Sequence, residues 1–416
     1  MGKTKRKRNT GKPDKQESDY VNQDERKDGA KMEYRVIPKL KLEAGVVGIG
    51  GEHLDGKPYA DVERTLHAAM DGGVNMLDLF MPGEEIRTNI GRALKGRRDR
   101  IMIQGMIGST DVGQQYDISR DPALCRKYFE DLLRFLGTDY IDFGMLFFID
   151  TDAAFEKVFG ADGDGEILRY AQDLKKAGTI RGVGASAHNP VTARRVVETG
   201  EIDLLLFSVN PAFDLMPLGL DIDTMLSDKG FDNLGSVQPA RAALYEACER
   251  MGVAITTMKT LGAGKLLSAE HTPFEKPLTP AQCIRYALDR PAVVSTLIGA
   301  ASPEQMRESL YYFEASEEEL DYSGILGGER SNFLGNCLYC GHCQPCPMEI
   351  DIPLLIRYLD VAQLGGENTP PSVREHYAEM KTRGGDCTAC GSCEARCPFS
   401  VPIIENMARA VKVFGN

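Results

Sequence analysis

The sequence predicts an α/β fold, a (β/α)8 TIM barrel followed by a small α-rich domain with eight closely spaced cysteines. Three observations predict it. Short apolar runs alternate with amphipathic stretches eight times between residues 32 and 313. Buried parallel strands have such continuous apolar sequences, and eight strand–helix units in this length are typical of a closed barrel. A polar, glycine-bearing linker over residues 314–335 then precedes the cysteines.

The eight units can be placed in order along the chain. Each pair gives the apolar run and then the helical stretch: 46–50 and 61–70, 74–78 and 84–94, 101–106 and 122–136, 140–148 and 166–177, 180–185 and 190–199, 202–208 and 239–250, 253–258 and 280–289, and 293–298 and 303–313. Glycines such as Gly137 and Gly178 stand where helices end. An open doubly wound sheet is the alternative, but the glycines at 48–51 lack the spacing of a dinucleotide-binding turn.

Composition excludes several classes of protein. The 416 residues are 42% hydrophobic with a net charge of −12, which disfavours nucleic-acid binding. We expect a disordered charged tail over residues 1–31, without a secretory signal. No apolar run is long enough for a membrane span, so a cytoplasmic location is expected. The long connection 210–238 is expected to cover a pocket as a lid.

Two cysteine motifs fill the last eighty residues. They are Cys337-x-x-Cys340-x-x-Cys343-x-x-Cys346-Pro347 and Cys387-x-x-Cys390-x-x-Cys393-x-x-x-Cys397-Pro398. Three cysteines in a tight loop supply three ligands of a [4Fe–4S] cluster, and in two-cluster ferredoxins the cysteine before proline binds the other cluster. Residues 336–416 are therefore predicted to form a ferredoxin-like domain with two [4Fe–4S] clusters.

The motifs allow two assignments. In the favoured one, Cys337, Cys340, Cys343 and Cys397 bind one cluster, and Cys387, Cys390, Cys393 and Cys346 bind the other. The alternative lets each motif complete its own cluster with the same eight residues. Two zinc sites are a further alternative, since paired Cys-x-x-Cys sequences also bind zinc. Cys125, Cys248 and Cys283 lie on predicted helices and are expected to be buried packing residues.

Six segments of the barrel carry a family resemblance. They are GVNMLD at 73–78, residues 85–94, LGTDYID at 136–142, KAGTIRGVGAS at 176–186, MKTLGAGKL at 258–266 and IGAASPEQ at 298–305. Residues 32–313 resemble the aldo/keto reductases. With its cysteine motifs, the chain is similar to the branch of that superfamily that has a C-terminal ferredoxin-like domain. The resemblance implies NADPH or NADH bound across the barrel top and an Asp–Tyr–Lys–His tetrad that reduces carbonyls.

The sequence departs from that tetrad at three of its four positions. Asp78 occupies the aspartate position, whereas the tyrosine falls at Gly83, the lysine near Met106 and the histidine at Phe147 or its neighbour. Gly, Met and Phe have no titratable proton, so the usual mechanism of carbonyl reduction is not expected.

Other residues are candidates to replace the lost groups. Asp78 is expected to pair with Arg87 or to act as an acid or base by itself. His188 follows the fifth predicted strand and His53 follows the first, and imidazole titrates near neutral pH. These two histidines are the candidate substitute proton donors.

Two loops predict an anion site at the barrel top. Gly262, Gly264 and Lys265 follow the seventh strand, while Gly299 and Ser302 precede the last helix, which is where this fold commonly binds phosphate. The alternative is that the glycines only make turns. The resemblance implies that these loops wrap a dinucleotide and extends the site to four more residues: Ser186, Met258, Lys259 and Gln305.

Three functions are consistent with the sequence. The first is an oxidoreductase that passes electrons through the clusters to a small-molecule substrate at the barrel top, with ferredoxin, flavodoxin or another redox enzyme as partner. The second is a non-catalytic electron-transfer subunit of a larger redox complex. The third is an NAD(P)H-dependent carbonyl reductase with a relocated proton donor.

Overall fold

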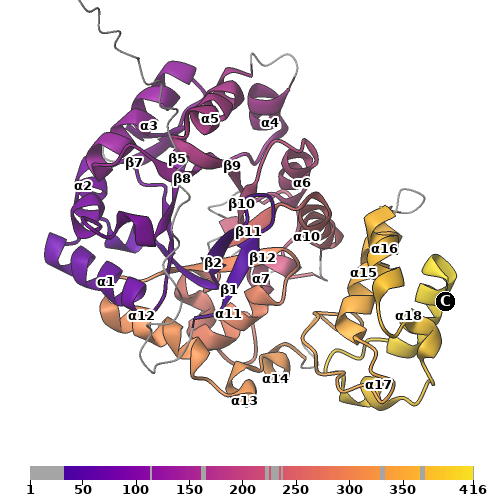
Figure 1. Ribbon diagram of the computed structural model, residues 1–416. Helices are drawn as coiled ribbons and strands as arrows, with labels where there is room; N and C mark the ends of the chain where they lie inside the picture. The colour runs from indigo at the N-terminus through magenta and orange to yellow at the C-terminus, as the bar shows by residue number, and fades with distance from the viewer. Residues whose placement is uncertain are drawn as a thin grey trace, which may run out of the picture. The chain divides into compact units, whose positions relative to one another are not determined.

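Eight parallel strands close into a barrel, as predicted. A computed structural model describes residues 32–112, 115–160, 165–220, 224–225, 234–235, 238–327, 333–365 and 371–415. Within these residues the barrel strands follow one another in chain order, and the last pairs with the first (Figure 1). The predicted barrel is therefore confirmed, and the open doubly wound sheet is wrong.

The barrel strands are short and almost wholly buried. They are β3 (Val47–Gly50), β4 (Met76–Leu79), β5 (Met102–Ile107), β8 (Ile141–Leu146), β9 (Ile180–Ala187), β10 (Leu204–Ser208), β11 (Ala254–Met258) and β12 (Val293–Gly299). One face of each strand fills the barrel interior and the other packs under helices, so both faces are apolar. This arrangement explains the continuous apolar runs in the sequence.

Helices connect the strands and cover the outside of the barrel. They are α1 (Tyr59–Asp71), α2 (Glu84–Ala93), α3 (Pro122–Leu136), α4 (Asp152–Phe159), α5 (Glu166–Ala177), α6 (Pro190–Glu198), α7 (Pro211–Leu215), α10 (Pro239–Met251), α11 (Pro280–Leu288) and α12 (Pro303–Leu310). Local sequence sets their ends. The Asp121 side chain accepts from two backbone N–H groups at the start of α3, and Gly137 ends it with a φ of 66°.

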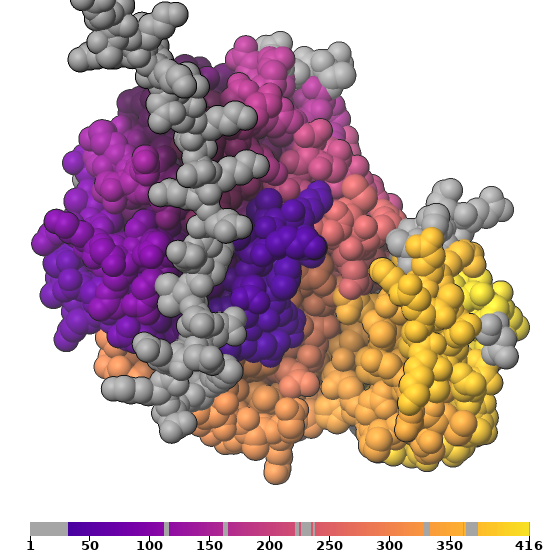
Figure 2. Space-filling view, viewed as in Figure 1, coloured from indigo at the N-terminus to yellow at the C-terminus, as the bar shows by residue number. Residues whose placement is uncertain are grey.

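Two hairpins, which were not expected from the sequence, lie at opposite ends of the barrel. β1 (Tyr34–Ile37) and β2 (Leu42–Gly45) cover the amino-terminal end, where Ile37 joins a buried cluster with Met76 and Phe143. Figure 2 shows this hairpin in indigo. β6 (Ser109–Val112) and β7 (Gln115–Ile118) follow β5 at the carboxyl end. Each hairpin thus borders one mouth of the barrel.

The C-terminal part of the chain is helical. It contains α13 (Glu317–Leu320), α14 (Ser323–Leu326), α15 (Ile352–Gly365), α16 (Pro371–Glu379), α17 (Ser392–Arg396) and α18 (Ile403–Phe414). α15 contacts α18 within this region and also reaches α10 of the barrel. The first two of these helices occur in the segment predicted as a linker.

Three predictions fall wholly or partly outside the described residues. The charged tail 1–31 is outside them, as is the centre of the predicted lid, and so are residues 328–332 of the predicted linker. The start of the lid is described and forms α7. No helix in the described part of the chain is both long and apolar enough to span a membrane.

Candidate active site and cysteine loops

Asp78 lies near the carboxyl end of β4, one residue before its last, and is held inside the barrel mouth by a chain of side-chain hydrogen bonds. Gln104 Nε2 donates to Asp78 Oδ1 over 3.2 Å, and Thr256 Oγ1 donates to Gln104 Oε1 over 2.7 Å. Burial raises the pKa of Asp78 to about 7; the Gln104 hydrogen bond opposes the shift, Glu52 adds to it and Lys259 opposes it. The carboxyl group can therefore hold a proton near neutral pH.

The predicted pairing of Asp78 with Arg87 is wrong. The guanidinium of Arg87 is fully buried, and it donates from Nε to the Met81 carbonyl at 2.8 Å and from Nη1 to the Tyr128 carbonyl at 3.0 Å. Arg87 thus links helix α2 to two backbone carbonyls. The side chain that donates a hydrogen bond to Asp78 is that of Gln104.

His188 forms an imidazole–carboxylate pair with Asp150. The two residues follow neighbouring strands, β9 and β8, and His188 Nδ1 lies 2.7 Å from Asp150 Oδ2. The backbone N–H groups of His188 and Asn189 donate to the other carboxylate oxygen. Burial alone would raise the pKa of Asp150, but these contacts outweigh it and lower the pKa. The fold therefore places an ionised carboxylate against an almost buried histidine.

The backbone next to this pair is tightly held. Phe148 has a φ of 58°, which is unusual for a residue with a side chain, and its ring centroid lies 4.8 Å from that of His188. Its N–H donates to Ser186 Oγ at 2.8 Å, while Arg120 donates to the carbonyls of Phe147 and Phe148. Strained backbone held by surrounding bonds is frequent at functional sites.

An aromatic cluster extends from His188 across the mouth of the barrel. The Phe147 ring lies 5.8 Å from Phe148 and 6.2 Å from Phe80, which follows β4. Tyr116 of the β6–β7 hairpin packs edge-on against Phe80 and Phe147 at 5.3 and 6.1 Å. Exposed Tyr116 is thus a phenol close to the mouth, although the tetrad tyrosine is absent from its usual position.

His53 is the other candidate histidine. It is exposed and belongs to the short helix η1 (Gly51–Leu54), and its ring packs on Gly299. A β-carbon on Gly299 would lie 2.4 Å from His53 Nδ1, so only glycine leaves room for the ring. Among the described residues no hydrogen bond joins His53 to Asp78 or His188. The structure therefore pairs His188 with a carboxylate, whereas His53 has no such pair among the described residues.

The loop after β11 is a tight turn. Lys259, Gly262, Ala263 and Gly264 all have positive φ, at 61°, 58°, 54° and 83°. The N–H groups of Gly262 and Gly264 donate within the loop, to the Lys259 carbonyl at 2.8 Å and to the Leu261 carbonyl at 3.0 Å, so these two donors are not available to an anion. No atom would crowd a β-carbon on Gly264, so the space beside it is open. Lys265 follows directly in the short helix η3 (Gly262–Leu267).

The remaining predicted cofactor residues have structural partners. Ser302 Oγ accepts from the Gln305 N–H at 3.4 Å, and Gln305 Oε1 accepts from the Ala301 N–H at 2.8 Å, so both cap helix α12. Ser186 supports Phe148 as described. Met258 ends β11 and is half-buried with the barrel-interior side chains.

Four of the eight motif cysteines line one cavity. Cys337, Cys340 and Cys343 from the first motif and Cys397 from the second share it with a shell of aliphatic and aromatic side chains. Burial and, after it, the neighbouring thiols of Cys340, Cys397 and Cys393 raise the pKa of Cys343 to about 12. The fold thus brings Cys397 to the first motif across more than fifty residues of sequence.

The two motifs fold into equivalent loops. Tyr339 and Ala389 precede the second cysteine of their motifs with φ of 55° and 53°, and each donates its N–H to the first cysteine's sulfur at 3.4 Å. The glycine after the second cysteine has a φ of 83° in one motif and 76° in the other. Arg396 joins the loops by donating to the Cys343 carbonyl at 2.6 Å.

The cysteine loops give no single-ion geometry. In the parts of the chain that the structure describes, no three His, Cys, Asp or Glu side chains converge closely enough to share one metal ion. The four thiols of the first cavity line its walls and do not converge on the position of one ion.

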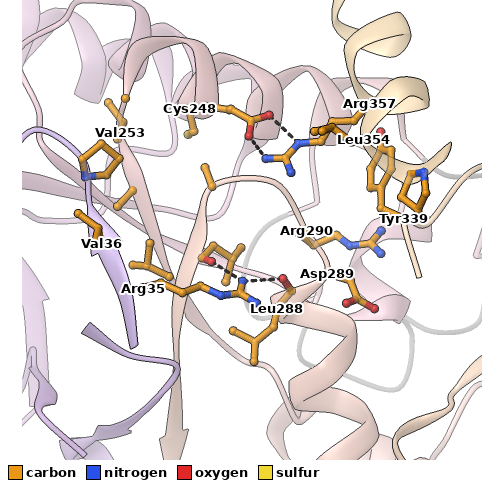
Figure 3. A pocket seen from close by; sticks show the side chains of 18 of the residues that line it. Arg35, Val36, Cys248, Val253, Leu288, Asp289, Arg290, Tyr339, Leu354 and Arg357 are labelled. Atoms are coloured by element: carbon orange, nitrogen blue, oxygen red, sulfur yellow. Dashed lines mark hydrogen bonds and ion pairs between the residues drawn. The ribbon is translucent and has the colours of Figure 1, made fainter. Parts of the chain in front are cut away.

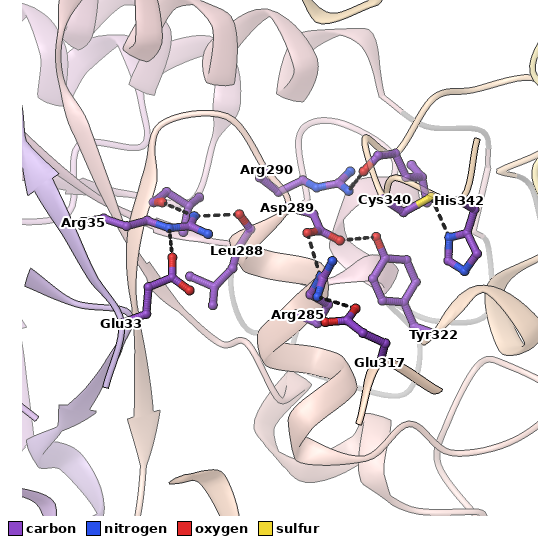
Figure 4. A network of polar contacts seen from close by, with 12 residues as sticks. Glu33, Arg35, Arg285, Leu288, Asp289, Arg290, Glu317, Tyr322, Cys340 and His342 are labelled. Carbon is purple, nitrogen blue, oxygen red and sulfur yellow. Dashed lines mark hydrogen bonds and ion pairs between the residues drawn. The ribbon is translucent and has the colours of Figure 1, made fainter. Parts of the chain in front are cut away.

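The first cysteine cavity lies toward the amino-terminal end of the barrel. Arg290, just before β12 begins, donates to the Leu338 carbonyl at 2.6 Å, and His342 lies 3.2 Å from the Cys340 sulfur (Figure 4). The predicted catalytic residues follow the opposite ends of the strands. The cavity and the His188–Asp150 pair are therefore not in contact.

The other three cysteines are buried on helices, as predicted. Cys125, Cys248 and Cys283 lie on α3, α10 and α11, and burial raises the pKa of each thiol.

Comparison with known proteins identifies the family. The aldo/keto reductase family model matches residues 41–282, more than half of the chain. The uncharacterized oxidoreductase YqkF of Bacillus subtilis is 26% identical over 309 residues, which cover 70% of this chain and 94% of the relative. The matched family segment ends before the first motif cysteine.

Solved structures share the fold. Aldo-keto reductase AKR11C1 from Bacillus halodurans, in its holo form, superposes with a TM-score of 0.54 at 21% identity and covers 70% of this chain and 94% of its own. A Pseudomonas aeruginosa protein assigned as an aldo-keto reductase gives 0.51 at 18% identity, covering 68% and 94%. The fold and the strand-end site define an α/β-barrel oxidoreductase. The chain belongs to the aldo/keto reductase family.

Several residues of this site were not found from the sequence. Gln104 lies inside an apolar strand run, and Tyr116 lies in an unpredicted hairpin. Asp150 could have been found, because polar residues that directly follow a barrel strand stand at the usual catalytic end.

Proposed function

We propose that the chain transfers hydride between a nicotinamide dinucleotide and a small carbonyl or alcohol substrate at the carboxyl end of the barrel. The observation that carries the proposal is the His188–Asp150 pair, held at 2.7 Å beside an aromatic mouth. It supplies the proton-transfer group that the degenerate tetrad lacks. Family membership supports the reaction class.

Two features at the barrel top support binding of a dinucleotide's phosphates. Lys259 and Lys265 lie in and directly after the loop that follows β11, and the start of helix α12 lies after the neighbouring strand. Cationic side chains and the backbone N–H groups at helix starts both favour anions. When bound, the dinucleotide would supply the hydride.

Asp150 would position and charge-stabilise His188. With Nδ1 committed to Asp150, Nε2 is the ring nitrogen left to give a proton to a substrate oxygen or take it back. The carboxylate stays ionised because its pKa is lowered, so it can hold the ring through a charge-assisted contact. Asp78, whose pKa is about 7, is a second proton-holding group at the mouth. The apolar rings would exclude water and favour an aromatic or aliphatic substrate.

Substitution of the pair tests this function. NADPH and NADH oxidation would be measured with a panel of aldehydes and ketones. We expect His188→Gln to lower kcat by about 100-fold or more, the usual contribution of a positioned acid. Asp150→Asn should also lower kcat and shift the pH profile, since it removes the charge that holds the ring.

His67→Gln is the matched control, because His67 lies on α1 and contacts only the Ala93 carbonyl in the hydrogen bonds of the described residues. Unchanged kcat in His188→Gln would contradict the proposal. Activity lost equally in His67→Gln would indicate a folding defect, which circular dichroism of both variants would reveal.

A second function is favoured by the cysteine loops. We propose that they bind two [4Fe–4S] clusters and that the C-terminal region transfers single electrons. Two observations support this: the loops have the same backbone conformation with N–H groups donating to sulfur, and Cys397 lines the cavity of the first motif. Each thiolate of a cluster binds its own iron, so the four thiols need not meet at one point. Ferredoxin or flavodoxin remains the proposed partner.

Double variants test the ligand assignment. We expect about eight irons per chain in protein purified without oxygen. If Cys337 and Cys397 serve one cluster, Cys337→Ser with Cys397→Ser should keep about four irons, whereas Cys337→Ser with Cys346→Ser should lose both clusters. The reverse pattern would mean that each motif completes its own cluster. Cys125→Ser is the control, and zinc in place of iron would overturn the proposal.

A further inference from the structure

A cavity of about 530 Å³ lies at the amino-terminal end of the barrel, away from the candidate active site. Its walls come from the β1 strand, the end of α10, the turn before β12 and the start of α15 (Figure 3). The volume falls in the range of small-molecule sites. The barrel and the C-terminal region therefore enclose a ligand-sized space together.

Two arginines face this cavity from opposite sides. Arg35 of β1 donates from Nη1 to the Leu288 and Val293 carbonyls at 2.8 and 2.9 Å, and its Nε is paired with Glu33 at 3.1 Å (Figure 4). Arg357 of α15 is fixed by Glu249, with Nε 2.6 Å from the carboxylate (Figure 3). Each guanidinium is thus oriented in advance, one from the barrel and one from the C-terminal region.

A third arginine carries a buried donor. Arg290 is only 6% exposed and lines the cavity, and its Nη2 donates to the Leu338 carbonyl. Its Nε has no hydrogen-bond partner among the described residues. A buried donor without an acceptor destabilises a fold, so such an atom in a cavity wall indicates a missing acceptor.

The acidic side chains that line the cavity already accept hydrogen bonds from other residues. Glu249 holds Arg357, and Asp351 accepts from the Leu354 N–H at the start of α15. Asp289 accepts from Arg285 and from the Tyr322 hydroxyl (Figure 4). Burial, and then the like charge of Arg35, lower the pKa of Arg357 to about 10. Arg35 is paired with Glu33 and Arg357 with Glu249, and among the described residues Arg35 Nη2 and Arg357 Nη1 have no hydrogen-bond partner.

We propose that this cavity binds a small organic oxyanion, a carboxylate or a phosphate ester, between Arg35 and Arg357. An oxyanion would accept from the terminal nitrogens that remain, Arg35 Nη2 and Arg357 Nη1, because charge-assisted hydrogen bonds from a guanidinium are strong. Apolar groups in the wall accommodate a carbon skeleton: Val36, Val253, Leu288, Val294 and Leu354. Because the two arginines come from different regions, the ligand would tie the C-terminal region to the barrel. Tyr339 and Pro353 also line the cysteine cavity, so the bound anion would lie behind its wall.

Calorimetric titration of the full chain tests the site. Inorganic phosphate and citrate would each be titrated at constant ionic strength. We expect saturable binding by one of them, weakened about tenfold or more in Arg35→Gln, because one charge-assisted contact is lost. Preference for phosphate would assign a phosphate ester and preference for citrate a carboxylate.

Arg64→Gln is the matched control, because Arg64 is an exposed arginine of α1 paired with Asp61. It should bind as the parent does. Arg357→Gln combined with Glu249→Gln removes the second guanidinium without leaving its carboxylate partner, and should also weaken binding. A thermal shift with ligand in the parent, absent in folded Arg35→Gln, is the second measurement. Absence of saturable millimolar binding, or equal affinity in Arg35→Gln and Arg64→Gln, would overturn the proposal.

Discussion

Asp78 shows how one residue can keep a family position and change its chemistry. In the family resemblance this aspartate pairs with a lysine, but here Met106 fills the lysine position. Gln104 on the next strand binds the carboxyl instead, and Lys259 approaches from the loop after β11 closely enough to oppose its pKa shift. A buried carboxyl without a paired cation holds its proton more tightly.

The raised pKa of Asp78 predicts a pH-dependent cost of folding. Below about pH 4 the carboxyl is protonated in both the folded and the unfolded chain, so burial costs little. As pH rises from about 4 to 7, the unfolded chain ionises first and folding loses free energy. Asp78→Asn removes this loss, so its stability gain over the parent should grow across that window by up to about 4 kcal/mol.

Urea unfolding at pH 5 and pH 8 measures this difference. Asp173→Asn, an exposed carboxylate paired with Lys176, controls for the loss of one charge. A constant stability difference between Asp78→Asn and the parent at both pH values would contradict the raised pKa.

At the residue scale, the sequence could predict which residues are candidates better than which side chains they contact. Asp78 was singled out by its position in the family resemblance and His188 by its place after a strand, and both stay candidates. The partner of His188 is 38 residues away, and the pairing of Asp78 with Gln104 depends on the register of β4 and β5. Such pairs exist only once the barrel has closed.

At the element scale, the strands and main helices were predictable because each has a strong local signal. The eight apolar runs became the eight barrel strands within a few residues. The β1–β2 and β6–β7 hairpins were missed because their strands are four residues long and lack a clear alternating pattern. Helix α4 was missed since it shares the fourth unit with α5.

The cysteine loops are the element that sequence specified most fully. Their spacing places three thiols in one turn, and the positive-φ residues recur at the same positions in both motifs. Only the origin of the fourth thiol depends on the fold. Cys397 at the first cavity agrees with the favoured assignment, and the double-variant experiment decides it.

At the scale of the whole molecule, the described chain has two separate candidate sites. The His188–Asp150 pair lies where barrel strands end, and the first cysteine cavity contacts Arg290 where β12 begins. The sequence predicted electron transfer from the clusters to the barrel mouth. The structure instead places helix α11 beside the cysteines. Hydride transfer at the carboxyl end of the barrel does not require the cysteine loops, so the two proposed functions can be tested separately.

The most direct test of the proposed hydride transfer is binding of the dinucleotide to the full chain. NADPH, and then NADH, would be titrated by calorimetry into the parent, Gly264→Ala and Gly324→Ala. Gly264 has a φ of 83°, which an alanine tolerates poorly, whereas Gly324 stands in a helix with open space around it. We expect one dinucleotide per chain, bound more weakly only in Gly264→Ala. Absence of binding of either dinucleotide to the folded parent at millimolar concentration would rule out the proposed hydride transfer.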